Sequence, residues 1–314
     1  MRLAFFGLPI AALALVRDGH ELVVAVLSPV EHPGRRRLGR LLPRDRLVDT
    51  RVGPPDFERR VEDLLGATNP ELLVSWYWTR RLPRRWLELP SRGAIGAHPS
   101  LLPRFRGPNP FFWAIDSGDH WTGVTVHCLT EEYDRGDILL QERLEVGLRD
   151  SSELARALDR PSLRLLRAAV SRLGRGEELA VRPQVEEQAS WAPEPTGDAL
   201  RVDWSWTTER VLRRIRALGP QPGLAIEVAG LRIFVTRAEP VPAMPVALEP
   251  GEAAVLGDPP EVLAIRTRDG AIGVRRAVAG LGPKLEPGQP IDAEGLALLV
   301  ARRRGVLDWA PSEE

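Results

Sequence analysis

The sequence LAFFGLPIAALALVRDGHELVVAVL, residues 3–27, carries the clearest signal of fold in this chain. Leu3–Phe6 and Glu21–Leu27 are apolar runs of strand length, and the apolar segment Ala11–Val16 between them predicts a helix. Pro9 suits the first turn of that helix, where a backbone N–H would have no helical acceptor. A strand, a helix and a second strand in so short a stretch predict a βαβ unit of an open, mostly parallel α/β sheet.

The rest of the chain continues this sheet and then changes character. Leu72–Ser75 predicts a further buried strand, and the Pro- and Gly-containing segment 182–197 predicts a linker. Short apolar strands separated by turn residues follow, which is the pattern of a small β-barrel. We therefore expect an α/β domain over residues 1–195 and a small β-barrel-like domain over residues 196–314.

Composition argues against several kinds of protein. The 314 residues contain 43 Lys and Arg and 43 Asp and Glu, so no overall charge attracts nucleic acid or a membrane surface. No apolar run reaches the ~18 residues of a membrane-spanning helix. The single cysteine, Cys128, permits no internal disulfide, which suits the cytoplasm. The five histidines lack metal-ligand spacing, so we expect no metal, and Gly7–Pro9 lacks the G-x-G-x-x-G of dinucleotide-binding turns.

The stretch HPSLLPRFRG, residues 98–107, places a histidine in a stiff turn. Each of its prolines fixes its own φ and restricts the residue before it, and the apolar strand Gly93–Ala97 leads into the turn. A second turn, rich in carboxylates, follows at residues 132–137 and contains Asp134. On two rigid turns His98 and Asp134 can form a general-base pair, in which the carboxylate fixes the tautomer of the imidazole.

Taken together, these stretches resemble the formyltransferase family that uses 10-formyltetrahydrofolate. The family motifs are HPSLLP and RxRG within residues 98–107, TGVTVH at 122–127 and DRGDIL at 134–139. The family includes methionyl-tRNA, glycinamide ribonucleotide and sugar N-formyltransferases. The resemblance implies an α/β catalytic domain, a folate co-substrate without a metal, and formyl transfer to an amine. It extends over the C-terminal region, where methionyl-tRNA formyltransferase has a small β-barrel-like domain.

The resemblance also implies roles for individual residues. His98 and Asp134 correspond to the catalytic histidine and aspartate of the family. Folate binding is implied for Trp78, Arg80, Leu82, Ser100, Leu101, Leu102, Pro103 and Tyr133. Acceptor binding is implied for Gly7, Leu8, Pro9 and Arg106. From the residues alone, the aromatic segment Trp76–Trp78 suits either a flat heterocycle or core packing. His127 is interpreted as a core or hydrogen-bonded histidine without a catalytic role.

Gly96 departs from the pattern of the family. The family has a catalytic asparagine two residues before the histidine, and its amide donates to the formyl oxygen, whereas glycine has no side chain to do so. Loss of one such donor costs on the order of 100- to 1,000-fold in rate. A bridging water beside Gly96, or the side chain of Asn109, are the alternatives that the sequence leaves for this donor.

Three functions stay open. The first is N-formylation of a small-molecule amine, such as an amino sugar or a natural-product intermediate. The second is tRNA formylation, favoured by an arginine-rich loop at Pro33–Arg40, which is otherwise a solvated surface loop. Against it stand Glu194, at a position that is basic in many family members, and a near balance of charges after residue 203. The third is a folate- or amine-binding paralogue without turnover, which Gly96 favours. The acceptor, the oligomeric state and the role of Arg35–Arg37 are not predicted.

Overall fold

The computed structural model describes residues 1–30, 32, 34–50, 56–242, 247–257, 259–280 and 287–304. These residues form two compact units. Unit 1 comprises Met1–Pro110, Trp121–Glu145 and Arg156–Pro193, and unit 2 comprises Phe111–His120, Val146–Ala155 and the described residues from Glu194 onward. Because two segments that precede residue 195 belong to unit 2, the predicted boundary after that residue stays a prediction.

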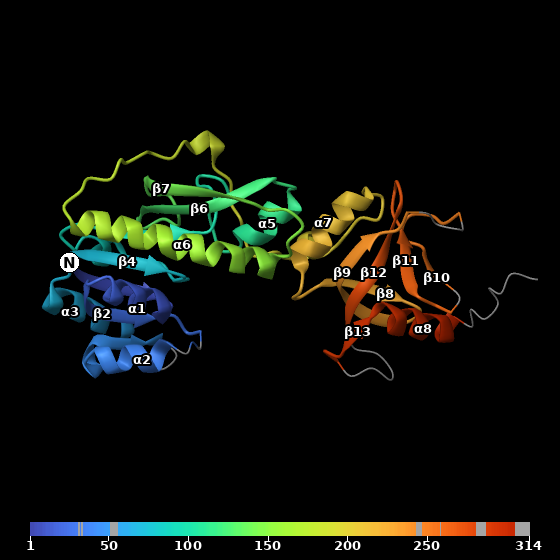
Figure 1. Ribbon diagram of the computed structural model, residues 1–314, viewed down its shortest axis with the longest axis horizontal. Helices are drawn as coiled ribbons and strands as arrows, with labels where there is room; N and C mark the ends of the chain where they lie inside the picture. The colour runs from blue at the N-terminus through green and yellow to red at the C-terminus, as the bar shows by residue number, and fades with distance from the viewer. Residues whose placement is uncertain are drawn as a thin grey trace, which may run out of the picture. The chain divides into compact units, whose positions relative to one another are not determined.

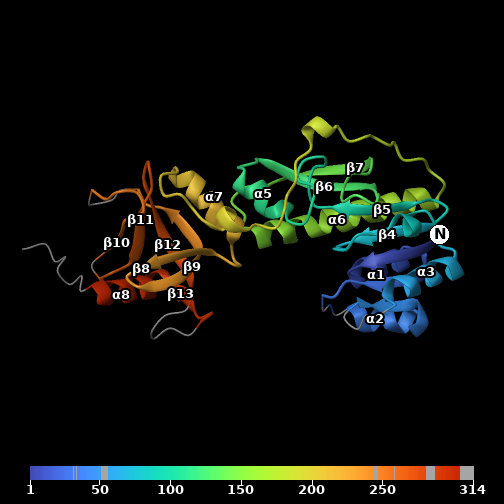
Figure 2. The same ribbon diagram turned by 180° about the vertical axis from the view of Figure 1, so that it is seen from behind.

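A seven-stranded sheet forms the centre of unit 1, in the order β3-β2-β1-β4-β5-β6-β7 (Figures 1 and 2). Its strands are β1 Arg2–Gly7, β2 Glu21–Leu27, β3 Leu47–Asp49, β4 Leu72–Trp76, β5 Ala94–His98, β6 Trp121–Cys128 and β7 Ile138–Glu145. Strands β1 to β5 pair in parallel, whereas the pairs β5–β6 and β6–β7 are antiparallel. The predicted open, mostly parallel sheet is confirmed.

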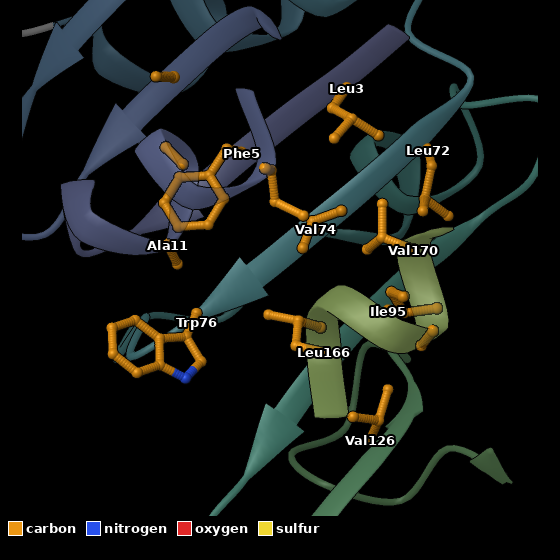
Figure 3. Close-up of a cluster of buried hydrophobic side chains, with 14 of the residues drawn as sticks. Leu3, Phe5, Ala11, Leu72, Val74, Trp76, Ile95, Val126, Leu166 and Val170 are labelled. Atoms are coloured by element: carbon orange, nitrogen blue, oxygen red, sulfur yellow. The ribbon is translucent and has the colours of Figure 1, made fainter. Parts of the chain in front are cut away.

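Both faces of the sheet are buried at β1, β2 and β4, which explains why these strands are continuously apolar. On one face, side chains of β1, β4 and β5 pack with α1 and α6; Figure 3 labels Phe5, Val74, Ile95 and Leu166 among them. On the other face, Phe6 and Leu73 pack with side chains of α3 and α4. The helices and 3₁₀ turns that begin in unit 1 are α1 Pro9–Arg17, α2 Gly34–Leu41, η1 Arg44–Arg46, α3 Phe57–Thr68, α4 Arg84–Leu87, α5 Pro110–Asp116 and η3 Glu186–Gln188. Helix α6, Ser151–Gly174, contains residues of both units.

The arginine-rich segment is not the loop that was expected. Gly34–Leu41 forms helix α2, because Leu38 is buried against the core and anchors the segment. Arg35 points inward and forms an ion pair with Asp49 at 2.5 Å, whereas Arg36 and Arg37 are exposed. Pro33, the first residue of the predicted loop, lies outside the described residues.

Unit 2 contains an antiparallel sheet in the order β10-β11-β12-β9-β8, with β13 beside β12. Its elements are η4 Gly197–Leu200, α7 Thr208–Leu218, β8 Leu224–Val228, β9 Leu231–Pro240, β10 Ala253–Leu256, β11 Val262–Arg266, β12 Ala271–Ala279, β13 Pro290–Asp292 and α8 Ala293–Arg304. This sheet confirms the predicted β-barrel-like region. Within the described residues, none of the helices combines the length and apolar character that crossing a membrane requires.

A buried charge cluster joins α5 to α7 within unit 2. Asp116 is only 4% exposed, and its carboxylate accepts two hydrogen bonds from Arg210, at 2.6 and 2.9 Å, and two from Arg214, at 2.6 and 3.1 Å. Burial opposes ionisation of Asp116, but the two guanidinium groups lower its pKa below the ordinary value. Asp116 ends the apolar helix α5, so the cluster fixes the end of that helix to α7.

Candidate active site

Strands β5 and β6 bring two histidines to the same face of the sheet of unit 1. His98 ends β5 opposite Thr125 of β6, and His127 lies opposite Gly96. Alternate residues of a strand share a face, and so do cross-strand partners. His98 and His127 are therefore diagonal neighbours, and both are buried, with exposures of 6% and 2%.

The carboxylate of Asp134 lies between the two imidazoles. Its Oδ2 is 3.5 Å from His98 Nδ1, and its Oδ1 is 3.7 Å from His127 Nε2. Both distances are longer than a good hydrogen bond, so the contacts are electrostatic rather than closed hydrogen bonds. The pair of His98 and Asp134 that was predicted from the sequence is thus close in space, and His127 joins it.

Each histidine directs its other nitrogen to a backbone carbonyl. His98 Nε2 lies 2.8 Å from the carbonyl oxygen of Phe105, and His127 Nδ1 lies 2.8 Å from that of Cys128. A carbonyl oxygen only accepts, so each of these nitrogens carries a hydrogen. Burial lowers the pKa of His127, and the nearby charge of His98 lowers it further, whereas Asp134 opposes both effects.

A network of polar side chains fixes the turn that carries Asp134. Asp134 has φ +56°, in the left-handed region, and its Oδ2 accepts from the Gly107 N–H at 2.9 Å. The amide of Gln184 donates to the carbonyl oxygens of Asp134 and Gly136, both at 2.7 Å. Arg106 in turn donates to Gln184 Oε1, at 3.0 and 2.8 Å.

Arg106 is 4% exposed, and it also donates to both carboxylate oxygens of Glu186, at 3.0 and 2.8 Å. Its guanidinium therefore supports the Asp134 turn, while its predicted contact with the acceptor stays a prediction. Gln184 and Glu186 were not singled out from the sequence, because they lie about 50 residues beyond the turn that they support. Only the fold makes them part of this site.

The turn that follows His98 is held by buried hydroxyls. The hydroxyl of Ser100 donates to the Arg104 carbonyl at 2.7 Å, and that of Thr125 donates to the Ser100 carbonyl at 2.7 Å. The Leu102 N–H donates to Thr125 Oγ1 at 3.1 Å, and Gln141 Nε2 donates to the Leu102 carbonyl at 2.7 Å. Ser100 and Leu102 are 0% and 3% exposed. Ser100 therefore uses its side-chain hydroxyl inside the turn, whereas Leu102 uses its backbone N–H and carbonyl there and has a buried side chain.

Gly96 faces an occupied space. A Cβ added at Gly96 would lie 2.8 Å from Leu129 Cδ2 and 3.4 Å from the Ser75 carbonyl oxygen. The place into which an asparagine side chain would project therefore holds the end of a leucine side chain. This apolar neighbour disfavours a bridging water as the substitute donor beside Gly96.

A cleft of about 370 Å³ opens within unit 1 beside this turn. It is lined by Arg81, Arg106, Glu132, Tyr133, Arg135, Glu186, Ala189, Ser190 and Trp191. Tyr133 and Trp191 are 39% and 52% exposed, and the Arg81 guanidinium lies 5.6 Å from the centre of the Tyr133 ring. Exposed rings beside guanidinium groups suit a flat heterocycle that carries anionic groups.

The other predicted contacts lie at the edges of the core. Leu82 is buried, and Trp78 packs edge-on against Phe6 with ring centres 5.4 Å apart, so core packing accounts for both side chains. Arg80 lies over the ring of Phe57 at 5.5 Å.

The turn after β1 is shaped by its backbone. A Cβ at Gly7 would lie 1.7 Å from the Trp76 carbonyl oxygen, so the close approach of β1 and β4 requires glycine. Leu8 donates its N–H to that same oxygen at 3.1 Å, and Pro9 begins α1. The predicted roles of these residues in acceptor binding stay predictions. In the described part of the chain, no cluster of three or more His, Cys, Asp or Glu side chains could hold a metal ion.

Comparison with family models and with curated proteins gives matches along most of the chain. The model described as "Formyl transferase" matches residues 23–167, and "Formyl transferase, C-terminal domain" matches residues 196–291. The chain is 31% identical over 305 residues to a methionyl-tRNA formyltransferase of Ralstonia nicotianae, covering 91% of this chain and 92% of that protein. It is 36% identical over 267 residues to one of Anaeromyxobacter dehalogenans, covering 82% and 85%.

Solved structures share the fold. HypX from Aquifex aeolicus, in complex with tetrahydrofolic acid, matches with a TM-score of 0.62 and 24% identity, over 90% of this chain and 44% of that one. An N-formyltransferase from Helicobacter canadensis, in complex with folinic acid and dTDP-3-aminofucose, matches with a TM-score of 0.66 and 14% identity, over 87% and 98%.

Proposed function

The chain belongs to the formyl transferase family, and on that premise we propose that it transfers a formyl group from 10-formyltetrahydrofolate to an amine. The observation that carries this proposal is the position of the Asp134 carboxylate. It lies between the buried imidazoles of His98 and His127, 3.5 and 3.7 Å from their inner nitrogens. Groups of this kind move protons at neutral pH, which is what acyl transfer between two nitrogens requires.

The reaction needs a proton acceptor and a proton donor in one place. As the amine nitrogen bonds to the formyl carbon it loses a proton, and the carbon–N10 bond breaks as the folate nitrogen gains one. When bound, 10-formyltetrahydrofolate supplies the activated formyl group. His98 and Asp134, 3.5 Å apart, are the groups that we propose accept the first proton and donate the second.

The cleft beside the turn fits the folate. Tyr133 and Trp191 expose ring faces on which a pterin or benzoyl ring can stack, and Arg81 offers a guanidinium group to the glutamate carboxylates, whereas Arg135 is paired with Glu132 and Glu186. Tyr133 is the predicted folate contact that lines this cleft. The other predicted folate contacts are retained as proposals on the resemblance alone.

The packing of Leu129 beside Gly96 determines the rate of formyl transfer that we expect. Because a leucine methyl fills the space where the family has an amide, we propose that the oxyanion is stabilised without that donor. A reaction slower by about 100- to 1,000-fold than one with the donor follows. If the rate of formyl transfer fell to zero, the chain would bind folate without turnover, which is the third function left open by the sequence.

As the acceptor we propose a small-molecule amine. Arg35 is withdrawn into an ion pair with Asp49, and Arg210 and Arg214 are committed to Asp116. These three arginines are therefore paired within the chain, whereas a tRNA partner would need arginines that are available to neutralise its phosphates. An amino sugar or another primary amine needs no such surface.

Methionyl-tRNA is the second candidate acceptor. The relatives from Ralstonia nicotianae and Anaeromyxobacter dehalogenans, which match 91% and 82% of this chain, are named methionyl-tRNA formyltransferases, and the C-terminal family model matches residues 196–291. Arg36, Arg37 and Arg40 are exposed on helix α2 and offer contacts to phosphates.

The test is amine-dependent release of tetrahydrofolate. The full chain is incubated with 10-formyltetrahydrofolate and either amino-sugar nucleotides, amino acids or charged initiator tRNA, with His98→Ala as the control. Release that needs one acceptor and disappears in the control supports the proposal and names the acceptor. Micromolar folate binding without release from any acceptor would favour the paralogue without turnover, and absence of folate binding would overturn the proposed function.

A further inference from the structure

We infer that His127 is a positioning residue of this site, which shares one exchangeable proton with His98 through the carboxylate of Asp134. The arrangement of the proton follows from contacts within unit 1. Its consequence for catalysis rests on the proposed function.

The first step is the tautomer of each imidazole. His127 Nδ1 and His98 Nε2 face the carbonyl oxygens of Cys128 and Phe105, both at 2.8 Å, so each of these nitrogens carries a hydrogen. In a neutral imidazole the remaining nitrogen then has only a lone pair. Both of these remaining nitrogens, His98 Nδ1 and His127 Nε2, face the carboxylate of Asp134.

The second step is the number of protons that the three groups hold. With both histidines neutral, two lone pairs face an anionic carboxylate, which is unfavourable. One added proton, on either inner nitrogen, gives an ion pair with Asp134 and removes that conflict. A second added proton would place two cations around one carboxylate, close to the buried charge of Arg106. We therefore expect His98, His127 and Asp134 together to hold one added proton beyond the state in which both imidazoles are neutral.

The third step is the environment of His127. The charged and titratable groups that act on it are Asp134, His98 and Arg106, and the carbonyl of Cys128 takes its Nδ1 hydrogen. Burial lowers the pKa of His127, and His98 and Arg106 lower it further, whereas Asp134 and the Cys128 carbonyl raise it. His127 is thus neutral when His98 carries the proton, and it becomes the alternative position for the proton when His98 is neutral.

During transfer, this arrangement keeps Asp134 paired with one cation. His98 Nδ1 gives its proton to the folate nitrogen as the carbon–N10 bond breaks, and the proton lost by the amine replaces it on the three groups. The count of protons is the same before and after the reaction. His127 contacts neither substrate in this scheme, so it acts by holding the carboxylate and not as a catalytic residue.

The test uses imidazole ¹⁵N NMR of the full chain labelled at histidine, in which five histidines give few signals. In the wild type we expect His127 as the Nδ1–H tautomer and His98 with a hydrogen on Nε2. In His98→Gln the neighbouring charge is lost, and we expect the pKa of His127 to rise above its wild-type value. An Nε2–H tautomer at His127, or an unchanged His127 titration in His98→Gln, would overturn the inference whether or not the chain is a formyltransferase.

Two substitutions of His127 separate its nitrogens in the kinetic test. His127→Gln places an amide donor near the Nε2 position, facing Asp134, whereas His127→Asn places one near Nδ1, facing the Cys128 carbonyl. We expect His127→Asn to lower kcat by about 10- to 100-fold with the folate KM unchanged, and His127→Gln to keep more kcat but lose one limb of its pH profile. Equal kcat losses with unaltered pH profiles would indicate a merely structural histidine and contradict the inference.

Discussion

Two aspartates, the buried Asp116 of unit 2 and the half-buried Asp134 of unit 1, are paired in opposite ways. Asp116 of unit 2 accepts four hydrogen bonds from two guanidinium groups at 2.6–3.1 Å. Asp134 of unit 1 faces two imidazoles at 3.5 and 3.7 Å and accepts one backbone hydrogen bond at 2.9 Å. Arginine keeps its proton at any ordinary pH, whereas histidine exchanges one near neutrality. The first carboxylate is suited to holding structure, and the second is suited to pairing with an imidazole that gains and loses a proton.

The largest expected effect comes from neutralising Asp134. Asp134→Asn keeps an acceptor for the Gly107 N–H but loses the negative charge that pairs with a protonated imidazole, so we expect kcat for formyl transfer to fall by about 100- to 10,000-fold. The melting temperature should change little, because the backbone contacts of the turn remain. Steady-state kinetics and thermal unfolding check this, and a variant that keeps more than about a tenth of kcat would contradict the role given to Asp134.

The corresponding change in unit 2 should act on stability. Asp116→Ala leaves Arg214, which is 5% exposed, without its counter-charge, and we expect a loss of about 3–5 kcal/mol in the free energy of unfolding. Urea unfolding followed by circular dichroism measures it. The matched control is Asp198→Ala, which removes a fully exposed carboxylate and should change stability by less than about 0.5 kcal/mol. Equal stability of the two variants would show that the Asp116 cluster is not a structural anchor.

Adding a hydrogen-bond donor at Gly96 should raise the formyl-transfer activity of the site around His98 and Asp134. Gly96→Asn alone meets Leu129 Cδ2, so we expect the gain only in the double variant Gly96→Asn/Leu129→Ala, where kcat rises by about 10- to 100-fold. Leu129→Ala alone is the control for loosened packing. The full gain in Gly96→Asn by itself would show that the leucine does not block the amide.

The smallest expected effect is a pH dependence of stability. Because its guanidinium partners lower the pKa of Asp116 in the folded chain, its stabilising contribution is present above its unfolded pKa of about 3.9. That contribution is lost as the pH falls through the lower folded value. The difference in unfolding free energy between wild type and Asp116→Ala should therefore be constant from pH 5 to 8 and shrink below about pH 4. A difference that grows on acidification would reverse the sign of the assigned shift.

The sequence predicted what depends on local pattern. Continuous apolar runs predicted the parallel strands, because both faces of that sheet are covered. The motifs around His98 and Asp134 predicted a pair that the fold brings within 3.5 Å. Turn residues between short strands predicted the second, antiparallel sheet.

What the sequence did not predict depends on contacts across the fold. The role of His127 needs the register of β5 against β6, and the role of Gln184 needs a contact between residues 50 positions apart. The side chain of Leu82, which the resemblance implies in folate binding, packs in the core, and its contact with folate stays a prediction. The arginine-rich segment was predicted to be a loop because Leu38, the residue by which the helix is anchored in the core, stands alone among arginines in the sequence.

The most direct measurement of the central claim compares the two aspartates under the same assay. Tetrahydrofolate release from 10-formyltetrahydrofolate is followed with the responding amine for wild type, Asp134→Asn and Asp116→Asn, at equal concentrations of folded protein. The account predicts that Asp134→Asn loses release while Asp116→Asn keeps it. Release that survives in Asp134→Asn, or disappears equally in both variants, would contradict the assignment of proton transfer to the His98–Asp134–His127 group.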